Sequence, residues 1–241
     1  MGSIHNQPRG RNILGRAWWG LVRFGFRLLY NEMAFTYDLV SWVVSLGQWR
    51  DWQRAALQHL NAEPGAQLLE LAHGTGNFEL DLHEAGYDTV ALDLSRAMGR
   101  ITQRKLRRNG INPPPLVRGR AQKLPFPTAA FPTVVSTFPT EFIIDPATLQ
   151  EVHRVLQPGG RLVVVFNGIL GRGEEARNAL ETLLEAAYRV TGQRGPWPVN
   201  VEEMLGNAGF EPQVVTERLN RSTVLLFLAV KRTEETNPPG S

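Results

Sequence analysis

The stretch Glu70-Leu71-Ala72-His73-Gly74-Thr75-Gly76-Asn77 carries the clearest structural signal in the chain. It joins an apolar run at residues 67–72, typical of a buried strand, to a helical pattern at residues 77–85. The two glycines let the backbone turn sharply and approach a ligand, and the N-terminus of the following helix offers unpaired N–H groups. The stretch therefore predicts a strand, loop and helix that bind a nucleotide-like ligand.

The next predicted strand ends in an acidic residue. It covers residues 88–94, and Asp93 lies 17 residues beyond Gly76. A carboxylate at the end of this strand can accept hydrogen bonds from both hydroxyls of a ribose. Ser95 then suits the N-cap of a helix that extends to residue 108. Asp93 strengthens the prediction of a nucleoside ligand.

Strand and helix patterns alternate over the rest of the chain. Asp145 and Pro146 suit the start of a helix, and the turn Pro158-Gly159-Gly160 is expected to lead into the fifth strand. The alternation predicts an α/β domain with a mostly parallel sheet and one antiparallel strand near the end. Further strands are expected at residues 114–120, 132–138, 160–168, 210–219 and 222–232, and further helices at residues 146–156, 174–190 and 201–208.

Composition and charge narrow the classes of function. The 241 residues include no cysteine, which excludes disulfide frameworks, thiolate metal sites and cysteine nucleophiles. The histidines other than His73 are scattered without ligand spacing, so no metal is expected. The net charge is only +3, but residues 1–31 hold five arginines and no acid, and residues 94–140 hold nine basic residues and no acid. This segregation indicates nucleic acid or a lipid surface as partner, with chance clustering on solvated helices as the alternative.

The first basic stretch coincides with an amphipathic pattern at residues 13–30. On a helical wheel Arg16, Arg23 and Arg27 lie within about 60° of one another, opposite a broad face of Trp, Phe and Leu. These arginines disfavour a membrane span, and no secretory signal is visible. Such a helix either lies in a membrane interface or packs over the domain core, and both fit a lid over an apolar pocket. We expect a cytoplasmic protein, with residues 12–30 allowing a peripheral position on the inner membrane face.

Four motifs in order resemble the class I S-adenosylmethionine-dependent methyltransferases: ELAHGTG, VALDLSRAM, GRAQKLPFPTAAFPTVV and LQEVHRVLQPGGRLVVV. The resemblance covers roughly residues 66–230. It implies a Rossmann-like seven-stranded α/β sheet in the order 3-2-1-4-5-7-6, with an antiparallel last strand, helices on both faces and the ligand at the carboxyl ends of the strands. We accordingly expect a helical arm and cover at residues 1–60, the donor-binding domain at residues 61–232 with a helical insertion at residues 170–200, and a flexible tail at residues 233–241.

The same resemblance implies S-adenosylmethionine as the cofactor and S-adenosylhomocysteine as the product. It also implies a set of cofactor-binding residues, each at a family motif position. These are Glu70, Ala72, His73, Gly74 and Gly76 around the methionine portion, Asp93 at the ribose, Leu94 and Met98 near the adenine, Arg120, Ala121 and Gln122 at the loop that faces the adenine amino group, and Thr137 and Phe138 at the end of the fourth strand.

Two residues depart from the family pattern. Ala72 stands at the usual first glycine, so the backbone there must accept a Cβ. Arg120 stands where many relatives have an aspartate that accepts a hydrogen bond from the adenine amino group, and a guanidinium cannot accept one. Backbone groups or the Gln122 side chain would then hold the adenine.

A second, narrower resemblance lies upstream of the core. The segments 34–38, 45–47 and 50–52 are similar to those of ubiquinone/menaquinone C-methyltransferases and some phospholipid N-methyltransferases. In those families a Tyr-Asp pair belongs to a helical cover over the donor, which would let Tyr37 close the pocket; a core tyrosine is the alternative. The pattern of the quinone enzymes breaks at Ser41, where they usually have Asn, and at Thr140-Glu141-Phe142, where they usually have an Arg-Asn pair.

The function expected from these observations is methyl transfer to a small hydrophobic or lipid-like acceptor. Such transfer needs alignment of the acceptor atom with the methyl group, exclusion of water from the site and removal of one proton from the acceptor. Tyr37, His73 and Glu141 are the candidate proton acceptors, although His73 also suits a hydrogen-bonded loop position.

Two alternatives remain open. The basic residues at 104–120 suggest a nucleic-acid methyltransferase, but residues 136–140 lack the Asn/Asp-Pro-Pro-aromatic signature, so we do not expect a nucleic-acid partner. Ala72 and Arg120 suggest a module that binds S-adenosylmethionine without turnover.

Overall fold

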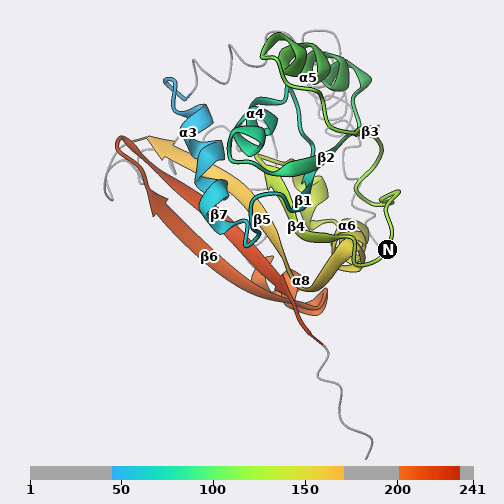
Figure 1. The fold of residues 1–241 in the computed structure, drawn as a ribbon. Helices are drawn as coiled ribbons and strands as arrows, with labels where there is room; N and C mark the ends of the chain where they lie inside the picture. Colours follow the sequence, from blue (N-terminus) through green and yellow to red (C-terminus); the bar gives the residue numbers. More distant parts are fainter. Residues whose placement is uncertain (1–44, 171–200, 234–241) are drawn as a thin grey trace, which may run out of the picture.

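The computed structural model describes residues 45–170 and 201–233, whose centre is a seven-stranded sheet (Figure 1). Its strand order is β3-β2-β1-β4-β5-β7-β6, the order that the sequence motifs predict. The strands are β1 Gln67–Leu71, β2 Asp88–Asp93, β3 Leu116–Arg118, β4 Phe131–Thr137, β5 Leu156–Leu170, β6 Phe210–Arg218 and β7 Ser222–Lys231.

The pairing confirms the mixed sheet. β1 runs parallel to β2 and β4, β2 runs parallel to β3, and β4 runs parallel to β5. β7 lies antiparallel to both β5 and β6, so it is the one strand inserted against the others. The chain crosses from β3 back to β4 beside β1, and a crevice at the carboxyl ends of the strands is expected at such a reversal.

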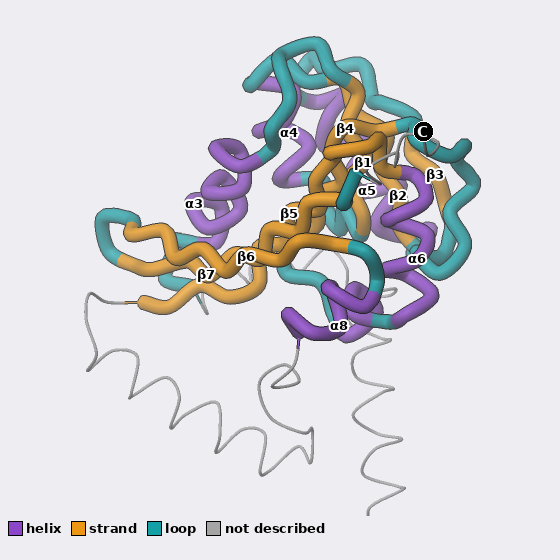
Figure 2. The backbone as a smooth tube through the Cα atoms, turned by 90° about the horizontal axis from the view of Figure 1, so that it is seen from below, coloured by secondary structure: helices purple, strands orange, loops and turns teal. Residues whose placement is uncertain are grey.

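Helices cover both faces of this sheet because side chains of the buried strands point alternately to the two sides. In β1, Leu68 packs in one apolar cluster with Phe78 and Trp52, whereas Leu69 packs in the other with Leu149. Figure 2 shows the two helical layers on either side of the strands. The first layer holds α3 Trp49–Arg54, η2 Ala55–His59, α4 Asn77–Glu84 and α5 Arg96–Arg108, and the second holds η3 Glu141–Ile144, α6 Pro146–Val155 and α8 Val201–Asn207.

Both predicted helix starts are confirmed. Ser95 is the N-cap of α5, where its Oγ accepts a hydrogen bond from the backbone N–H of Met98 at 3.3 Å. Asp145 is the N-cap of α6, where a carboxylate oxygen accepts from the backbone N–H of Ala147 at 2.9 Å and Pro146 takes the first helical position. These side chains satisfy N–H groups that a helix end leaves unpaired.

The expected turn before the fifth strand is wrong in one respect. β5 begins at Leu156, directly after α6, so Pro158-Gly159-Gly160 lies inside the strand as an irregularity of its pairing with β4. Gly159 has a φ of 71°, and a Cβ on Gly160 would lie 2.9 Å from the Pro132 carbonyl oxygen. The pairing with β4 skips from Leu156 to Arg161, so these residues form a bulge beside the backbone of β4.

Several predictions fall on other parts of the chain. The arm at residues 12–30, Tyr37, Ser41 and the helix at residues 174–190 lie outside the described residues. Among the helices that are described, none has the length and apolar character needed to cross a membrane.

Candidate functional site

The loop after β1, residues 72–76, has left-handed backbone conformations, and we call it the glycine loop. Ala72, Gly74 and Gly76 have φ values of 57°, 54° and 76°. For alanine this conformation costs about 1 kcal/mol, and here the Ala72 N–H donates to the Leu92 carbonyl oxygen at 2.7 Å. The loop therefore adopts the glycine-type turn even though its first position carries a Cβ, and its last residue, Gly76, directly precedes α4.

Asp93 closes this loop onto the end of β2. Its Oδ2 accepts from the Gly74 N–H at 3.0 Å and its Oδ1 accepts from the Ser95 N–H at 2.7 Å. The side chain is 6% exposed. Each carboxylate oxygen has a second acceptor position, so Asp93 can hold the loop and still accept hydrogen bonds from a ligand.

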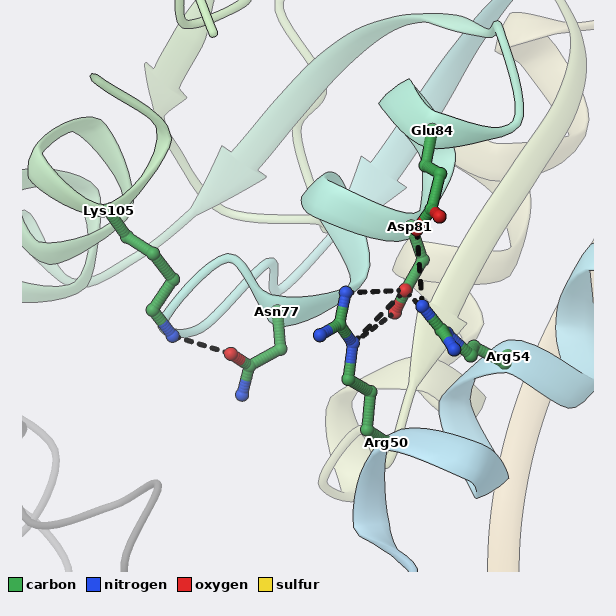
Figure 3. Close-up of polar contacts among 6 residues, drawn as sticks. All are labelled: Arg50, Arg54, Asn77, Asp81, Glu84 and Lys105. Carbon is green, nitrogen blue, oxygen red and sulfur yellow. Dashed lines mark hydrogen bonds and ion pairs between the residues drawn. The ribbon is translucent and has the colours of Figure 1, made fainter. Parts of the chain in front are cut away.

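The inner side of α5 supports the same loop through residues that the sequence motifs did not single out. Thr102 donates from its Oγ1 to the Gly74 carbonyl oxygen at 3.0 Å, and a Cβ on Gly76 would lie 2.5 Å from the Thr102 methyl carbon. Lys105 donates from its Nζ to Asn77 at 2.5 Å (Figure 3). A polar residue in the buried row Met98, Thr102, Leu106 is the signal that could have identified Thr102.

His73 is held by two of these groups. Its Nδ1 lies 3.0 Å from the Gly74 carbonyl oxygen and 3.2 Å from Thr102 Oγ1. A carbonyl oxygen can only accept, so this contact assigns a hydrogen to Nδ1, and in the neutral form of the ring Nε2 is then the acceptor. His73 is 5% exposed and lines a cavity of ≈ 210 Å³.

That cavity joins the loop to the cleft between α5 and β3. His73 and Asp93 line one part of it, and Leu116 and Val117 of β3 line another. The rest of its lining comes from α5 and its N-cap together with Arg118: Ser95, Arg96, Gly99, Arg100, Gln103 and Arg118. The arrangement offers a ligand one carboxylate, one imidazole, three guanidinium groups and the apolar side chains of β3.

Glu70 lies beneath the loop, buried on β1. Burial, followed by the neighbouring Glu79 carboxylate and a hydrogen bond with it, raises the pKa of Glu70 well above its ordinary value. Glu79 is equally buried and accepts a hydrogen bond from Thr89 at 2.6 Å. The side chain of Glu70 thus faces α4. Any effect of Glu70 on ligand binding would be indirect, through the loop that follows β1.

At the switch point the end of β4 contacts α3. Gln53 donates from Nε2 to Thr137 Oγ1 at 2.9 Å, and the Trp49 ring stacks on Phe138 with 4.0 Å between centroids. Phe138 has a φ of 51°, which turns the chain away from the strand. Trp49 and Gln53 are thus neighbours of the candidate site that the sequence motifs did not indicate.

The remaining predicted residues occupy different environments. Leu94 is 59% exposed at the end of β2, whereas Met98 and Ala121 are buried. Gln122 donates from Nε2 to Asp145 at 3.1 Å, so its amide is engaged with the N-cap of α6. Arg120 and Glu141 are exposed, and Tyr37 lies outside the described residues. In the segments that the structure describes, no group of His, Asp or Glu side chains could hold a metal ion.

Solved structures with this architecture include several methyltransferases. The geranyl diphosphate C-methyltransferase of Streptomyces coelicolor A3(2) superposes with a TM-score of 0.57 and 15% identity over 74% of this chain and 78% of that one. The phosphoethanolamine N-methyltransferase 2 of Haemonchus contortus gives a TM-score of 0.59 and 15% identity over 78% of this chain and 53% of that one. These likenesses show the fold.

Curated relatives are more similar in sequence. The demethylmenaquinone methyltransferase of Beutenbergia cavernae is 41% identical over 138 residues, which are 56% of this chain and 55% of the relative. The ubiquinone/menaquinone biosynthesis C-methyltransferase of Shewanella sp. is 34% identical over 142 residues, which are 57% of each protein. The alignments span little more than half the length of these relatives. The model of the ubiE/COQ5 methyltransferase family matches residues 26–170, and this chain belongs to that family.

Proposed function

We propose that this protein transfers a methyl group from S-adenosylmethionine to a small, hydrophobic, lipid-like acceptor of the quinol type. The observation that carries the proposal is the glycine loop closed onto Asp93 at the carboxyl ends of β1 and β2, in a chain of the ubiE/COQ5 methyltransferase family. The loop, the Asp93 carboxylate and the cavity lie together at the carboxyl ends of the strands, where such folds bind nucleosides.

The residues present suit the donor. A Cβ on Gly74 would meet only the Ala72 carbonyl oxygen, at 4.0 Å, so a ligand could approach the backbone there, and Asp93 retains acceptor positions for ribose hydroxyls. Gly74, His73 and Ala72 would surround the methionine portion, with Leu94 beside the adenine. The bound donor would supply a methyl group on a sulfonium, which is already activated toward displacement.

The acceptor class rests on the relatives. Two of them are named demethylmenaquinone methyltransferase and ubiquinone/menaquinone C-methyltransferase, and a reduced quinone ring offers a nucleophilic carbon. In our proposal residues 12–30 and 174–190 provide the pocket for this apolar acceptor. Residues 12–30 would also favour an anionic membrane surface, where such acceptors dissolve.

One proton must leave the acceptor when the new carbon–carbon bond forms. The Nε2 lone pair of His73 suits this task, since Nδ1 is engaged with Gly74 and Thr102 and fixes the ring. Tyr37 and Glu141 are the other candidates of the proposal. In the proposal, residues 12–30 and 174–190 would also exclude water from the site. The protein would otherwise need only to align the acceptor carbon with the methyl group.

Calorimetry with S-adenosylmethionine tests the donor half of the proposal. The variant Asp93→Asn keeps one carboxamide oxygen for two backbone N–H groups, so one N–H loses its acceptor and the donor affinity should fall roughly 10- to 100-fold. Asp88→Asn, at the opposite end of the same strand, makes the same chemical change on an exposed side chain and should leave the affinity unchanged.

Release of S-adenosylhomocysteine in the presence of a demethylated naphthoquinol tests the acceptor half. A lower rate of turnover in His73→Gln, with unchanged donor affinity, would support His73 as the proton acceptor. Absence of donor binding by the unaltered protein at high micromolar S-adenosylmethionine would overturn the proposal as a whole.

A further inference from the structure

The outer side of α5 carries a row of arginines that form no ion pair with the described residues. Arg96, Arg100, Arg104, Arg107 and Arg108 are all exposed, and α5 contains no acidic residue. A helix of this length extends the row over about 20 Å, more than two Debye lengths at physiological salt.

The arginines of α3 differ from those of α5. Arg50 and Arg54 both bind the buried carboxylate of Asp81, at 2.9 and 2.6 Å, and Arg54 also reaches Glu84 at 3.2 Å (Figure 3). These contacts neutralise the cations of α3 and join it to α4. Among the cations of α5, Lys105 bonds to Thr75 in the loop after β1 and to Asn77 of α4, whereas within the described part of the chain no such contact holds the arginines of the outer side.

The row of arginines borders the candidate site. Arg96 and Arg100 line the same cavity as Asp93, and Arg118 adds a further cation from β3, which is the edge strand of the sheet. Arg118 donates from Nε to the Leu94 carbonyl oxygen at 3.2 Å, which holds its side chain at the rim. We call the set Arg96, Arg100, Arg104, Arg107, Arg108 and Arg118 the α5 basic face.

We propose that the α5 basic face binds the surface of an anionic phospholipid bilayer and thereby holds the cavity beside the phase in which an apolar acceptor dissolves. This inference rests on the proposed function for its acceptor. Phospholipid phosphates need only a set of exposed cations, each of which contributes about 1 kcal/mol near such a surface. Single-stranded nucleic acid is the less suitable partner, because the exposed side chains of α5 are arginine and glutamine and offer no aromatic ring for stacking.

The test uses the full-length protein and vesicles of phosphatidylglycerol and phosphatidylcholine in equal parts. The variant R104Q/R107Q/R108Q removes three charges of the face that do not line the cavity, and we expect its partition coefficient to fall roughly 100-fold. The control R218Q/R221Q/R232Q removes three exposed charges from β6, its hairpin turn and the end of β7, at the opposite edge of the sheet. We expect the control to bind these vesicles within about twofold of the unaltered protein, and binding to fall with added salt.

The outcomes separate this inference from the proposed function. Calorimetry with S-adenosylmethionine should give the same affinity for both triple variants and the unaltered protein, whereas methyl transfer to a vesicle-embedded acceptor should fall only in R104Q/R107Q/R108Q. Equal losses of vesicle binding in the two variants, no loss in either, or displacement from vesicles by an equal mass of single-stranded RNA would overturn the proposed surface. Failure of the unaltered protein to bind the donor would overturn the proposed function and leave the vesicle comparison to decide the surface by itself.

Discussion

Both halves of the sheet share the apolar core, but the contacts near their carboxyl ends differ. In the half β3-β2-β1, polar side chains hold the backbone: Asp93 binds two N–H groups, and Thr102 and Lys105 reach the glycine loop from α5. In the half β4-β5-β7-β6, apolar side chains fill the space, and the indole of Trp52 lies against Gly168 with its Nε1 donating to Ser222 at 2.8 Å. The polar half is the one that contains the cavity.

This difference shows how the fold separates stability from binding. A ligand needs backbone groups that stay accessible, and side-chain hydrogen bonds can hold a loop without covering it. Long antiparallel strands such as β5, β6 and β7 instead gain stability from close packing, where a small change of volume is costly. Changes in the apolar half should therefore alter stability most, and changes in the polar half should alter donor affinity most.

The largest expected loss of stability is that of Gly168→Ala. The new Cβ would overlap the Trp52 indole, which is buried and fixed by its hydrogen bond to Ser222, so the free energy of unfolding should fall by about 3 kcal/mol. Chemical denaturation measures this. The control Gly206→Ala, with no atom within 4 Å of the added Cβ in α8, should not lower stability. A donor affinity that fell in folded Gly168→Ala would contradict the separation of the two halves.

Compared with Gly168→Ala, the variant Gly76→Ala should lose less stability, about 2 kcal/mol, and more donor affinity. Its Cβ would combine a left-handed φ of 76° with contact at 2.5 Å to Thr102. Gly110→Ala is a matched control, because Gly110 has a φ of 74° and no atom within 4 Å of the added Cβ. The double variant Gly76→Ala/Thr102→Ser, which removes the clashing methyl group, should recover part of the donor affinity in calorimetry. No recovery would show that Thr102 does not position the loop through this contact.

At the acid end of the range the smallest effect is expected for Glu70→Gln, and this effect changes with pH. The raised pKa of Glu70 means that the folded protein holds this proton more tightly than the unfolded chain, so its stabilising effect is full below the ordinary carboxyl pKa and is lost as pH rises. The slope is at most about 1.4 kcal/mol per pH unit for one proton.

Denaturation of Glu70→Gln from pH 5 to pH 8 should show a stability relative to the unaltered protein that increases with pH. Glu63→Gln, which alters an exposed carboxylate, should show no such trend. A difference for Glu70→Gln that stayed constant over this range would mean that the folded protein does not hold the Glu70 proton more tightly than the unfolded chain, which would contradict the raised pKa.

Local patterns predicted most of the described elements because each depends on neighbours in sequence. The caps Ser95 and Asp145 lie where their helices begin, and the strand order is the one that the resemblance to class I methyltransferases implies. The error at Pro158-Gly159-Gly160 arose because the strand already pairs with β4 at Leu156, before this turn-like segment, and a local pattern does not contain that pairing. The supports Gln53, Thr102 and Lys105 escaped prediction for the same reason, since each contacts a residue at least 28 positions away.

The amino-acid sequence by itself determined the class of sheet, the glycine loop, the position of Asp93 and the presence of an uneven charge. These follow from periodicity, from the conformations open to glycine and from the order of the motifs. Only the tertiary structure decided which cations are neutralised and which stay exposed: Asp81 neutralises Arg50 and Arg54, Lys105 turns to the loop, and the arginines of α5 remain at the surface beside the cavity. The physical reason is that an ion pair or a buried hydrogen bond requires atoms within a few ångströms, and sequence order does not contain those distances.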